Sequence, residues 1–586
     1  MSFTIRILSH GKTVSARKKQ ILSDVLRDAG VPISLYCNKR GLCGKCFVEI
    51  VKGRRPSPGE KEKYWLELKK LGDRHRLACQ FEVTGNLEVN VPASFTRQEI
   101  PILPAVHRSA VRPDPAVKKY YLELQRPEIA SPVSLFDLLL EGLGIENLKI
   151  PLEVLRNLGR TLEKADFKVT AVVHLEKEVV SVEIGNTVGR TFGLAVDLGT
   201  TTLVLDLVDL DSGKTLDTEA ALNSQVSRGA DVISRITYAF GDAAKAAELK
   251  KLALETLNGM IGRLLARNRL DRFSVYEVVI SGNTVMSHIL AGVPVDTLAT
   301  APYQALFSRL PVQAAAEVGL AVHPRGKVFF SPNIKSFVGG DISSGLLASR
   351  VAWKRGRFLL LDLGTNGEIV LKAGDRLLTT STAAGPAFEG MNISCGMPAL
   401  PGAVYKVEEA GEIRTHSLAG APAQGVCGTG LIDLIAVFLA RGEILPRGAI
   451  RNEAKRIVVA ENIVLTQEDV RQMQLACAAV KSGIRMMLAQ NQLTVEDLDG
   501  IYIAGAFGNY LNIRNSMAIG LLPRIDESNV TFIGNASLAG ARQLLLAKEE
   551  REKVEALVRK IRYVSLAADP QFQDHFIQAL EFQAWP

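Results

Sequence analysis

The pattern of apolar and polar positions changes along the chain, and each change predicts a different element. Apolar and polar residues alternate in 3–8 and recur in 12–14, which predicts a hairpin. The stretch SDVLRDAG predicts a short helix that is capped by Ser23 and ended by Gly30. CFVEIVKG predicts a further strand, and FEVTGNLEVNVP predicts a second hairpin with its turn at Gly85-Asn86. Together these elements predict a small β-rich fold with one helix against the sheet.

The next two segments differ sharply in pattern. Residues 92–115 contain five prolines and have no helical or strand period, which predicts a tether or semi-rigid spacer. Ordered patterning resumes in 117–190, where SLFDLLLEGLG and IPLEVLRNLGRTLEK have helical character and TAVVHL and VVSVEIG read as strands. No catalytic constellation stands out there, so we interpret this segment as a spacer or docking domain.

The remainder of the chain contains an internal repeat. GLAVDLGTTTLVLDLVD begins at residue 193, and RFLLLDLGTNGEIVLKAGD begins at residue 357. Each copy predicts an apolar strand, a tight D-x-G-T turn and a second strand. Glycine in such a turn lets backbone N–H groups approach phosphate oxygens, threonine hydroxyls add donors, and an aspartate can hold hydrated magnesium or orient water. The equivalent positions are Asp197 with Asp362, Gly199 with Gly364, and Thr200 with Thr365.

Length and composition limit the class of protein. At 586 residues the chain predicts several domains, and 47% hydrophobic with 23% charged residues indicates a protein that buries large cores. No run reaches the roughly 18 apolar residues that cross a bilayer, and the first residues lack the apolar core of a signal peptide. We therefore expect a cytoplasmic protein that binds no membrane.

The net charge of +8 is concentrated in the first domain. Residues 1–94 hold 18 Lys and Arg against 9 Asp and Glu, so the other 492 residues are nearly neutral. A basic module attracts nucleic acid, an acidic protein or an anionic cofactor of its own, or it is merely a soluble lysine-rich surface.

The seven cysteines are few for so long a chain, and four of them share the basic domain. Their spacing is C-x5-C-x2-C followed after 32 residues by a fourth cysteine, within and beyond YCNKRGLCGKCFVEI. Structural zinc sites usually have two C-x2-C knuckles, whereas three cysteines in one loop and a distant fourth are typical of 2Fe-2S ferredoxins. The pattern therefore favours one 2Fe-2S cluster over zinc or free thiols, with the ligands Cys37, Cys43, Cys46 and Cys79.

Several other polar residues have two interpretations each. His75 could be a ligand or a surface histidine, and the complete cysteine set favours the surface. Asn223 and Asn283 could line a cleft or cap helices. Glu368 could position water or be an exposed strand residue. The three remaining cysteines lack ligand spacing, so we expect small core residues: Cys395, Cys427 and Cys477.

The repeat resembles the actin, sugar kinase and heat-shock chaperone ATPase superfamily. In that superfamily two related lobes clamp a nucleotide between paired phosphate hairpins. GIYIAGAFGNYLN at 500–512 looks like its adenosine motif, FIGNASLAGARQLLLA at 532–547 like the helix that follows, and FVGGDISSGLLAS at 337–349 like an interlobe connection. The resemblance implies ATP and Mg²⁺ as ligands, with Asp197 and Asp362 catalytic. The implied nucleotide-binding residues are Gly199, Thr200, Thr201, Thr202, Gly364, Thr365, Asn366, Gly505 and Gly508.

The whole chain resembles the reductive activators of corrinoid proteins, on the cysteine loop, the two turns, AAGPAFEGMNISCGM at 383–397 and IAGAFGN. The resemblance implies a multidomain α/β protein. Its parts would be a β-grasp 2Fe-2S ferredoxin domain (1–94), a linker (95–116), a middle α/β domain (117–190) and a two-lobed actin-like ATPase of duplicated ribonuclease H-like lobes (191–586).

The same resemblance implies an activity. Such a protein would use ATP to return cobalt(II) of an inactivated corrinoid protein to cobalt(I), by one electron from its cluster. It would be an enzyme of one-carbon metabolism in an anaerobe, serving a corrinoid methyltransferase system. An acidic reduced ferredoxin or similar donor, and a second copy of the chain in a homodimer, would be its other partners.

Two other classes of function predict the same motifs. An ATP-gated electron donor to another metalloenzyme, such as a radical dehydratase, would differ in the partner that stimulates ATP turnover. A sensor that uses nucleotide and cluster only as ligands would bind without multiple turnovers. A sugar kinase would have no use for a ferredoxin domain.

Overall fold

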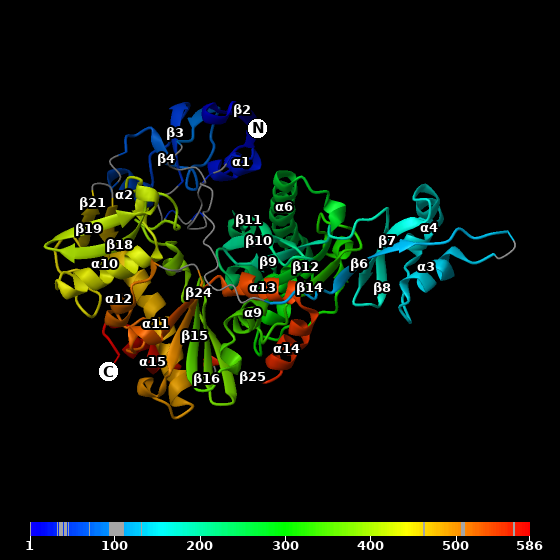
Figure 1. The fold of residues 1–586 in the computed structure, drawn as a ribbon. Coiled ribbons are helices and arrows are strands. Elements are labelled where there is room, and N and C mark those ends of the chain that lie inside the picture. Colours follow the sequence, from blue (N-terminus) through cyan, green and yellow to red (C-terminus); the bar gives the residue numbers. More distant parts are fainter. Residues whose placement is uncertain are drawn as a thin grey trace.

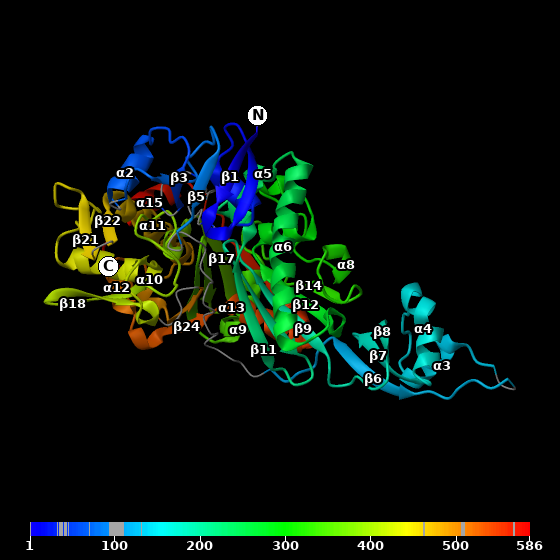
Figure 2. The ribbon, with the colours of Figure 1, turned by 90° about the horizontal axis from the view of Figure 1, so that it is seen from above.

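The computed structural model describes residues 2–31, 33, 39, 41, 44, 46–68, 71–92, 111–129, 132–460, 463–505, 510–566 and 569–585. Figures 1 and 2 show a two-lobed body with an N-terminal sheet domain resting on it, and a smaller arm that extends from one side. In the described residues, no helix is both long enough and apolar enough to cross a membrane.

The N-terminal domain is one mixed sheet with the strand order β2-β1-β5-β3-β4. The predicted first hairpin is confirmed, because β1 pairs antiparallel with β2, while β5 lies parallel to β1 on its other side. Leu22 and Leu26 of α1 are fully buried in the core beneath the sheet. The elements are β1 Ser2–Ile7, β2 Lys12–Arg17, α1 Leu22–Asp28, β3 Phe47–Lys52, α2 Glu60–Leu68, β4 His75–Leu77 and β5 Leu87–Asn90.

Two local predictions in this domain are wrong. Ser23 is not the cap of α1 but a fully buried residue inside it, and Ile21 occupies the cap position. The second hairpin does not form: residues 81–84, all of which are described, make only an isolated bridge between Glu82 and Ile21. β5 instead pairs with β1 and β3, because its apolar residues Leu87 and Val89 complete the core.

The arm is a three-stranded antiparallel sheet with two helices on one face (Figure 1). The helices are amphipathic, and residues such as Leu139 and Leu158 pack against Val169 and Val179 of the sheet. Both predicted helices and both predicted strands are confirmed. The elements are β6 Val117–Glu123, α3 Leu135–Leu143, α4 Leu152–Lys164, β7 Lys168–His174 and β8 Glu178–Ile184.

The first lobe of the body is a six-stranded sheet of order β11-β10-β9-β12-β14-β13. β9, β10 and β11 are antiparallel neighbours, and β12 and β14 continue the sheet parallel to β9. Its strands are β9 Phe192–Leu198, β10 Thr202–Asp209, β11 Thr215–Leu222, β12 Val275–Gly282, β13 Gln313–Ala314 and β14 Lys327–Phe330. Its helices are α5 Val232–Ala239, α6 Ala243–Asn268, α7 Thr284–Ala291 and α8 Ala315–Val318.

The second lobe repeats this plan with the order β24-β23-β15-β16-β17-β25. β15, β16 and β17 are antiparallel neighbours, while β23 and β24 are parallel to β15. The duplicated two-lobed fold predicted from the repeat is therefore confirmed. The strands are β15 Arg357–Leu363, β16 Gly367–Ala373, β17 Arg376–Thr382, β23 Gly500–Ala504, β24 Val530–Gly534 and β25 Ile561–Tyr563.

Helices and smaller sheets cover the second lobe. The nearly apolar α10 and the long α11 bury most of their residues in its core. The helices are α10 Gly428–Ala440, α11 Gln467–Ala489, α12 Ile513–Ala518 and α15 Phe572–Ala579. α14 Lys548–Val558 follows α13, and its Arg551 forms an ion pair with Glu277 of the first lobe. The small sheets comprise β18 Ala403–Ala410, β19 Glu412–Ser417, β20 Gly425–Val426, β21 Arg456–Ala460 and β22 Ile463–Thr466.

Two packed helices join the lobes. α9 (Gly340–Ser349) follows the first lobe and leads into β15, and α13 (Ala536–Leu546) follows β24 and packs its apolar residues against the first lobe's sheet. They approach closely because their contact residues are small. A Cβ on Gly540 would lie 2.1 Å from the carbonyl oxygen of Ser344. The interlobe connection predicted at 337–349 and the helix predicted at 532–547 are thus two helices in contact.

The N-terminal domain rests near both lobes (Figures 1 and 2). The negative charge of Asp24, on α1, helps to raise the pKa of Arg228 in the first lobe, so these two residues lie near each other. At the other side of the domain, burial raises the pKa of Tyr64 on α2, and the charge of Asp469 on α11 adds to the rise. The domain therefore reaches from one lobe to the other.

Candidate functional site

The first phosphate turn of the repeat connects β9 to β10 and includes Gly199, Thr200 and Thr201. Gly199 is required by the turn itself, because a Cβ there would lie 2.2 Å from the carbonyl oxygen of Thr202. Asn223 supports the turn, since its side-chain amide donates to the carbonyl of Gly199 at 3.0 Å. The turn thus presents its threonines on a rigid base.

A buried arginine braces the same turn from behind. Arg235 on α5 has no exposed surface and donates to the carbonyl oxygen of Thr200 at 2.5 Å and to Gln225 at 2.9 Å. Burial lowers the pKa of Arg235 to about 9, which still leaves the guanidinium charged at neutral pH. Its positive charge beneath the turn favours an anion in front of it.

The second turn connects β15 to β16 and contains Gly364, Thr365 and Asn366. A Cβ on Gly364 would meet only the carbonyl of Asn366, at 3.9 Å, so this glycine is not required by contacts within the chain. The space beside the backbone of Gly364 is therefore open, and a ligand could approach the backbone there. The two equivalent glycines therefore differ: contacts within the chain require glycine at position 199 but not at position 364.

The two turns meet across the lobes. The hydroxyl oxygens of Thr201 and Thr365 lie 3.1 Å apart, although 164 positions separate them in sequence. Glu389, which the sequence did not single out, accepts from Thr365 at 2.6 Å and from Thr201 at 3.2 Å. Hydroxyl donors from both lobes therefore converge on one anion position.

Asp197, at the end of β9, is held by residues that lead into and begin α13. Its two carboxylate oxygens accept from Asn535 at 2.8 Å and from Ser537 at 2.7 Å. Ser537 also lies 3.0 Å from Ser281 of β12. Burial raises the pKa of Asp197, and these two hydrogen bonds oppose the rise. The residues orient Asp197 without neutralising it.

Asp362, at the end of β15, lies in a group of acidic residues. Burial raises its pKa to about 7, and the charges of Asp341, Asp197 and Glu389 add to the rise. Burial also raises the pKa of Asp341, at the start of α9, to about 7, with a contribution from Asp197. These carboxyls therefore exchange protons near neutral pH, as a general base or an organiser of water requires.

Glu368, on β16, belongs to the same group. Burial raises its pKa well above the ordinary value, and the charges of Asp341 and Asp362 contribute. It is buried, so the exposed-strand interpretation is wrong. Within the described part of the chain, no three Cys, His, Asp or Glu side chains form a set that could hold a metal ion. A magnesium ion here would need water and phosphate oxygens to complete its six ligands, which is its usual mode of binding beside nucleotides.

The adenosine-like motif places Gly505 against Asp362. Gly505 has φ +99°, and a Cβ there would lie 3.0 Å from a carboxylate oxygen of Asp362. Gly508 lies outside the described residues. The two asparagines of uncertain role both cap helices: Asn223 begins a 3₁₀ turn (Ser224–Ser227) and Asn283 begins α7. Asn223 also supports the phosphate turn, as described above, whereas Asn283 donates to Phe337.

Of the four predicted cluster ligands, Cys46 and Cys79 lie within the described residues, and Cys37 and Cys43 lie outside them. Cys46 and Cys79 belong to one small buried group with Phe47, Trp65 and Leu77. The side-chain amide of Gln80 lies 3.5 Å from the sulfur of Cys79, as a donor to a thiolate would. Gly41 and Gly44 both have positive φ, which matches a loop that wraps closely.

The other predictions for cysteine and histidine have simple outcomes. Cys395, Cys427 and Cys477 are buried in the second lobe, as predicted for core residues. His75 is half-buried at the start of β4.

Several residues of the site were not found from the sequence. Asp341 lies in 337–349, which resembled an interlobe connection, and Asn535 and Ser537 lie in 532–547, which resembled the helix after the adenosine motif. Neither Arg235 nor Glu389 lies within the repeat, and neither was predicted as a site residue. Arg235 lies in the stretch that starts at Asn223 and was considered for a cleft, and Glu389 lies in the distinctive stretch 383–397.

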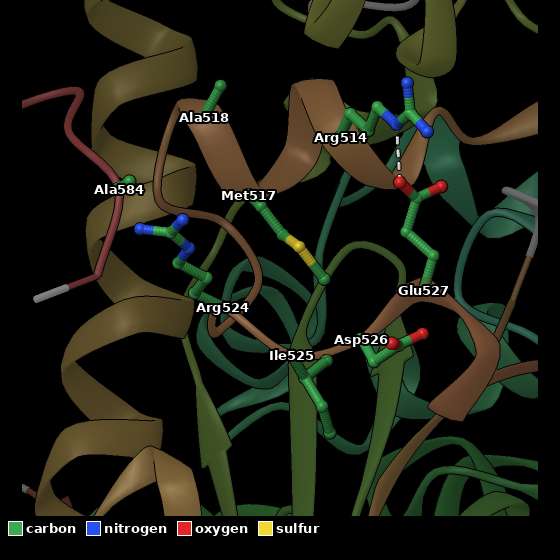
Figure 3. Close-up of a pocket in the computed structure, with 8 residues that line it drawn as sticks. All are labelled: Arg514, Met517, Ala518, Arg524, Ile525, Asp526, Glu527 and Ala584. Atoms are coloured by element: carbon green, nitrogen blue, oxygen red, sulfur yellow. Dashed lines mark hydrogen bonds and ion pairs between the residues drawn. The ribbon is translucent and has the colours of Figure 1, made fainter.

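A separate cavity of about 690 Å³ lies between α12, the loop that precedes β24, and the C-terminal segment (Figure 3). Arg514 and Glu527 form an ion pair at 2.5 Å on its rim, and Arg524 lies on the opposite side with its guanidinium towards Ala584. Met517 and Ile525 form its apolar part. None of its lining residues belongs to the two D-x-G-T turns, so the cavity is separate from the site at which these turns meet.

Comparison with known proteins places the chain in a family. It is 31% identical over 600 residues to the "Corrinoid activation enzyme RamQ" of Eubacterium limosum, with 97% of each chain covered. A solved structure named "Reductive activator for corrinoid,iron-sulfur protein" is 33% identical, covers 99% of this chain and 98% of its own, and superposes with a TM-score of 0.76. The chain belongs to the family of reductive activators of corrinoid proteins.

Family models cover most of this activator's length. A "2Fe-2S iron-sulfur cluster binding domain" matches residues 5–84, and the "RACo linker region" matches 106–189. The "RACo middle region" matches 192–354, and the "C-terminal domain of RACo the ASKHA domain" matches 357–585. The activator is also 27% identical over 430 residues to the "[Co(II) methylated amine-specific corrinoid protein] reductase" of Methanosarcina barkeri, with 67% of this chain and 77% of that protein covered.

Proposed function

We propose that this chain is an ATP-dependent reductive activator, which passes one electron from a 2Fe-2S cluster to cobalt(II) of an inactivated corrinoid protein and restores cobalt(I). The observation that carries the proposal is the meeting of the two phosphate turns, at Thr201 and Thr365, in a chain that also has a ferredoxin-type domain. An ATPase site and an electron carrier in one molecule fit a reaction in which ATP drives electron transfer.

The energetics explain why ATP is needed. Reduction of cobalt(II) to cobalt(I) by a 2Fe-2S donor is uphill, and each 0.1 V costs about 2.3 kcal/mol for one electron. Nucleotide can meet such a cost only if one arrangement of the protein binds the oxidised partner better than the other. A change in how the two lobes sit about the α9 and α13 pair would be one way to give two such arrangements.

The proposed cluster ligands are Cys37, Cys43, Cys46 and Cys79. When bound, the cluster supplies the electron. The burial of Cys46 and Cys79 together, and the amide of Gln80 directed at Cys79, fit thiolate ligands better than inert core residues.

At the nucleotide site we assign Asp197 to hydrated magnesium and Asp362 to the attacking water. Two neutral donors orientate Asp197 and oppose the rise in its pKa that burial causes, which suits a metal anchor. Asp362 has a pKa of about 7, as a general base requires. We assign the phosphate contacts to Gly199, Thr200, Thr201, Thr202, Gly364, Thr365 and Asn366, and the purine to Gly505 and Gly508.

The proposed partners follow from charge and from the family. The excess of Lys and Arg in residues 1–94 suits an acidic reduced ferredoxin or similar donor. A corrinoid protein that serves a methyltransferase is the proposed electron acceptor. We further propose a cytoplasmic homodimer in the one-carbon metabolism of an anaerobe, with domain boundaries near residues 94, 116 and 190.

The test is the effect of the acceptor's oxidation state on ATP hydrolysis. Only a ligand with different affinity for two protein states can shift their equilibrium, so a cobalt(II) corrinoid protein should stimulate hydrolysis more than its cobalt(I) or methylated form. Equal rates with all three forms would contradict the proposal. Stimulation by a different metalloenzyme alone would favour the alternative electron-donor function.

A further inference from the structure

Glu389 occupies the point where the two phosphate turns meet. Its Oε2 accepts from the hydroxyl of Thr365 at 2.6 Å and from that of Thr201 at 3.2 Å, one residue from each lobe. Burial raises the pKa of Glu389, and the two threonine hydroxyls and the charge of Arg235 oppose the rise. A carboxylate of the chain itself therefore sits where donors converge for an anion.

A hydroxyl group has one proton to donate. Thr365 cannot donate to Glu389 and to a phosphate oxygen at the same time, and the same limit applies to Thr201. An ionised carboxylate would in addition repel a phosphate at this distance, because solvent is scarce there. Glu389 and a nucleotide phosphate therefore compete for the same donors.

We propose that Glu389 is an internal competitor of the nucleotide phosphates, and that its carboxylate leaves Thr201 and Thr365 when ATP binds. This inference rests on the proposed function only in taking the two turns as the phosphate site. The competition sets the affinity for nucleotide, and it makes the position of Glu389 depend on whether phosphate is bound.

The segment that holds Glu389 has a glycine of positive φ on each side of a short turn, and it is tied to α11 further on. Glu389 ends a single 3₁₀ turn (Pro386–Glu389), with Gly385 (φ +75°) before it and Gly390 (φ +74°) after it. Further on, the backbone N–H of Ser394 donates to Asp469 at 2.5 Å, and the Ser394 hydroxyl donates to the same carboxylate. Ser394 thus ties the segment to the first turn of α11.

This anchor lies close to the N-terminal domain. The charge of Asp469 acts on Tyr64 of α2, which belongs to the ferredoxin-type domain. Residues 389–394 therefore connect the two threonines to α11. Release of Glu389 would change the conformation of this segment, which Ser394 joins to α11 beside the N-terminal domain.

The test compares Glu389→Gln with wild type in full-length protein, using a non-hydrolysable ATP analogue and isothermal titration calorimetry in magnesium buffer. The amide keeps the shape of the side chain but removes its charge, so we expect binding about tenfold tighter, within the usual range of coupling between two ligands. Loss of a merely structural residue would weaken binding instead. Glu443→Gln, at a surface ion pair with Arg441, is the matched control and should bind as wild type does.

Unchanged affinity in Glu389→Gln would overturn the proposal, and weaker affinity would make Glu389 a helper of the nucleotide rather than its competitor. Hydrogen exchange of the wild type gives a second test that needs no variant. The analogue should increase exchange in residues 386–393 and leave the amide of Ser394 protected, and unchanged exchange would overturn the proposal. No binding of the analogue to wild type would instead refute the nucleotide site itself, and with it the proposed function.

Discussion

At the scale of single residues, the two aspartates of the repeat have become chemically different. Asp197 is orientated by Asn535 and Ser537, whereas burial, with the added charges of acidic neighbours, raises the pKa of Asp362 to about 7. Asp197→Asn and Asp362→Asn should each lower magnesium-dependent ATP hydrolysis by about a hundredfold or more, because one loses the metal anchor and the other the base. Steady-state turnover measures both. Unchanged turnover in either variant would remove that residue from the mechanism.

The different environments also predict the pH dependence. If ionised Asp362 is the base, turnover should rise with pH through about 7, because the carboxyl must lose its proton first. The charge of Asp341 helps to raise this pKa, so Asp341→Asn should move the midpoint to lower pH. The pH profile of turnover in the two proteins measures the shift. A midpoint that stays in place, or moves upward, would contradict the electrostatic assignment.

At the scale of elements, the contact between α9 and α13 depends on small residues. A Cβ on Gly540 would lie 2.1 Å from a backbone oxygen of α9, so Gly540→Ala must separate the helices and should destabilise the protein by about 1–3 kcal/mol. The control is Gly262→Ala on α6, where an added Cβ meets nothing within 4 Å and helix propensity favours alanine by about 0.8–1 kcal/mol. Thermal unfolding should show a lower melting temperature for the first variant and an equal or higher one for the second. A lower melting temperature in both variants, or a higher one in both, would contradict the packing argument.

The sequence predicted those elements that are formed by interactions between residues close together in the chain. It failed where the partners lie far apart in the chain. The D-x-G-T turns, the strands around them and the helices of the arm follow from local pattern, and all were predicted. The strand expected at 81–84 failed because β5 pairs with β1, some 80 positions away, and no local pattern encodes that choice. Glu389 was missed for the same reason, since its partner Thr201 is 188 positions away. Its role exists only after the lobes have come together.

At the scale of the whole molecule, the basic N-terminal domain lies near both lobes of the ATPase. Its surplus of positive charge should speed docking of an acidic electron donor, and salt should screen this attraction beyond a Debye length of about 8 Å at physiological ionic strength. Stopped-flow reduction by an acidic ferredoxin should therefore become slower as salt increases. A neutral chemical reductant is the control and should show no such dependence. A flat profile with the ferredoxin would assign the lysines and arginines to solubility alone.

The central claim is that nucleotide drives the electron to cobalt, and one measurement tests it most directly. A reduced donor of modest potential, this protein and a cobalt(II) corrinoid protein are mixed without oxygen, and cobalt(I) absorbance is followed with and without ATP. We predict sustained formation of cobalt(I) only with ATP. Asp362→Asn should fail to sustain it despite a reducible cluster, and Cys79→Ala should fail while still binding nucleotide. Equal yields of cobalt(I) with and without ATP would contradict the account.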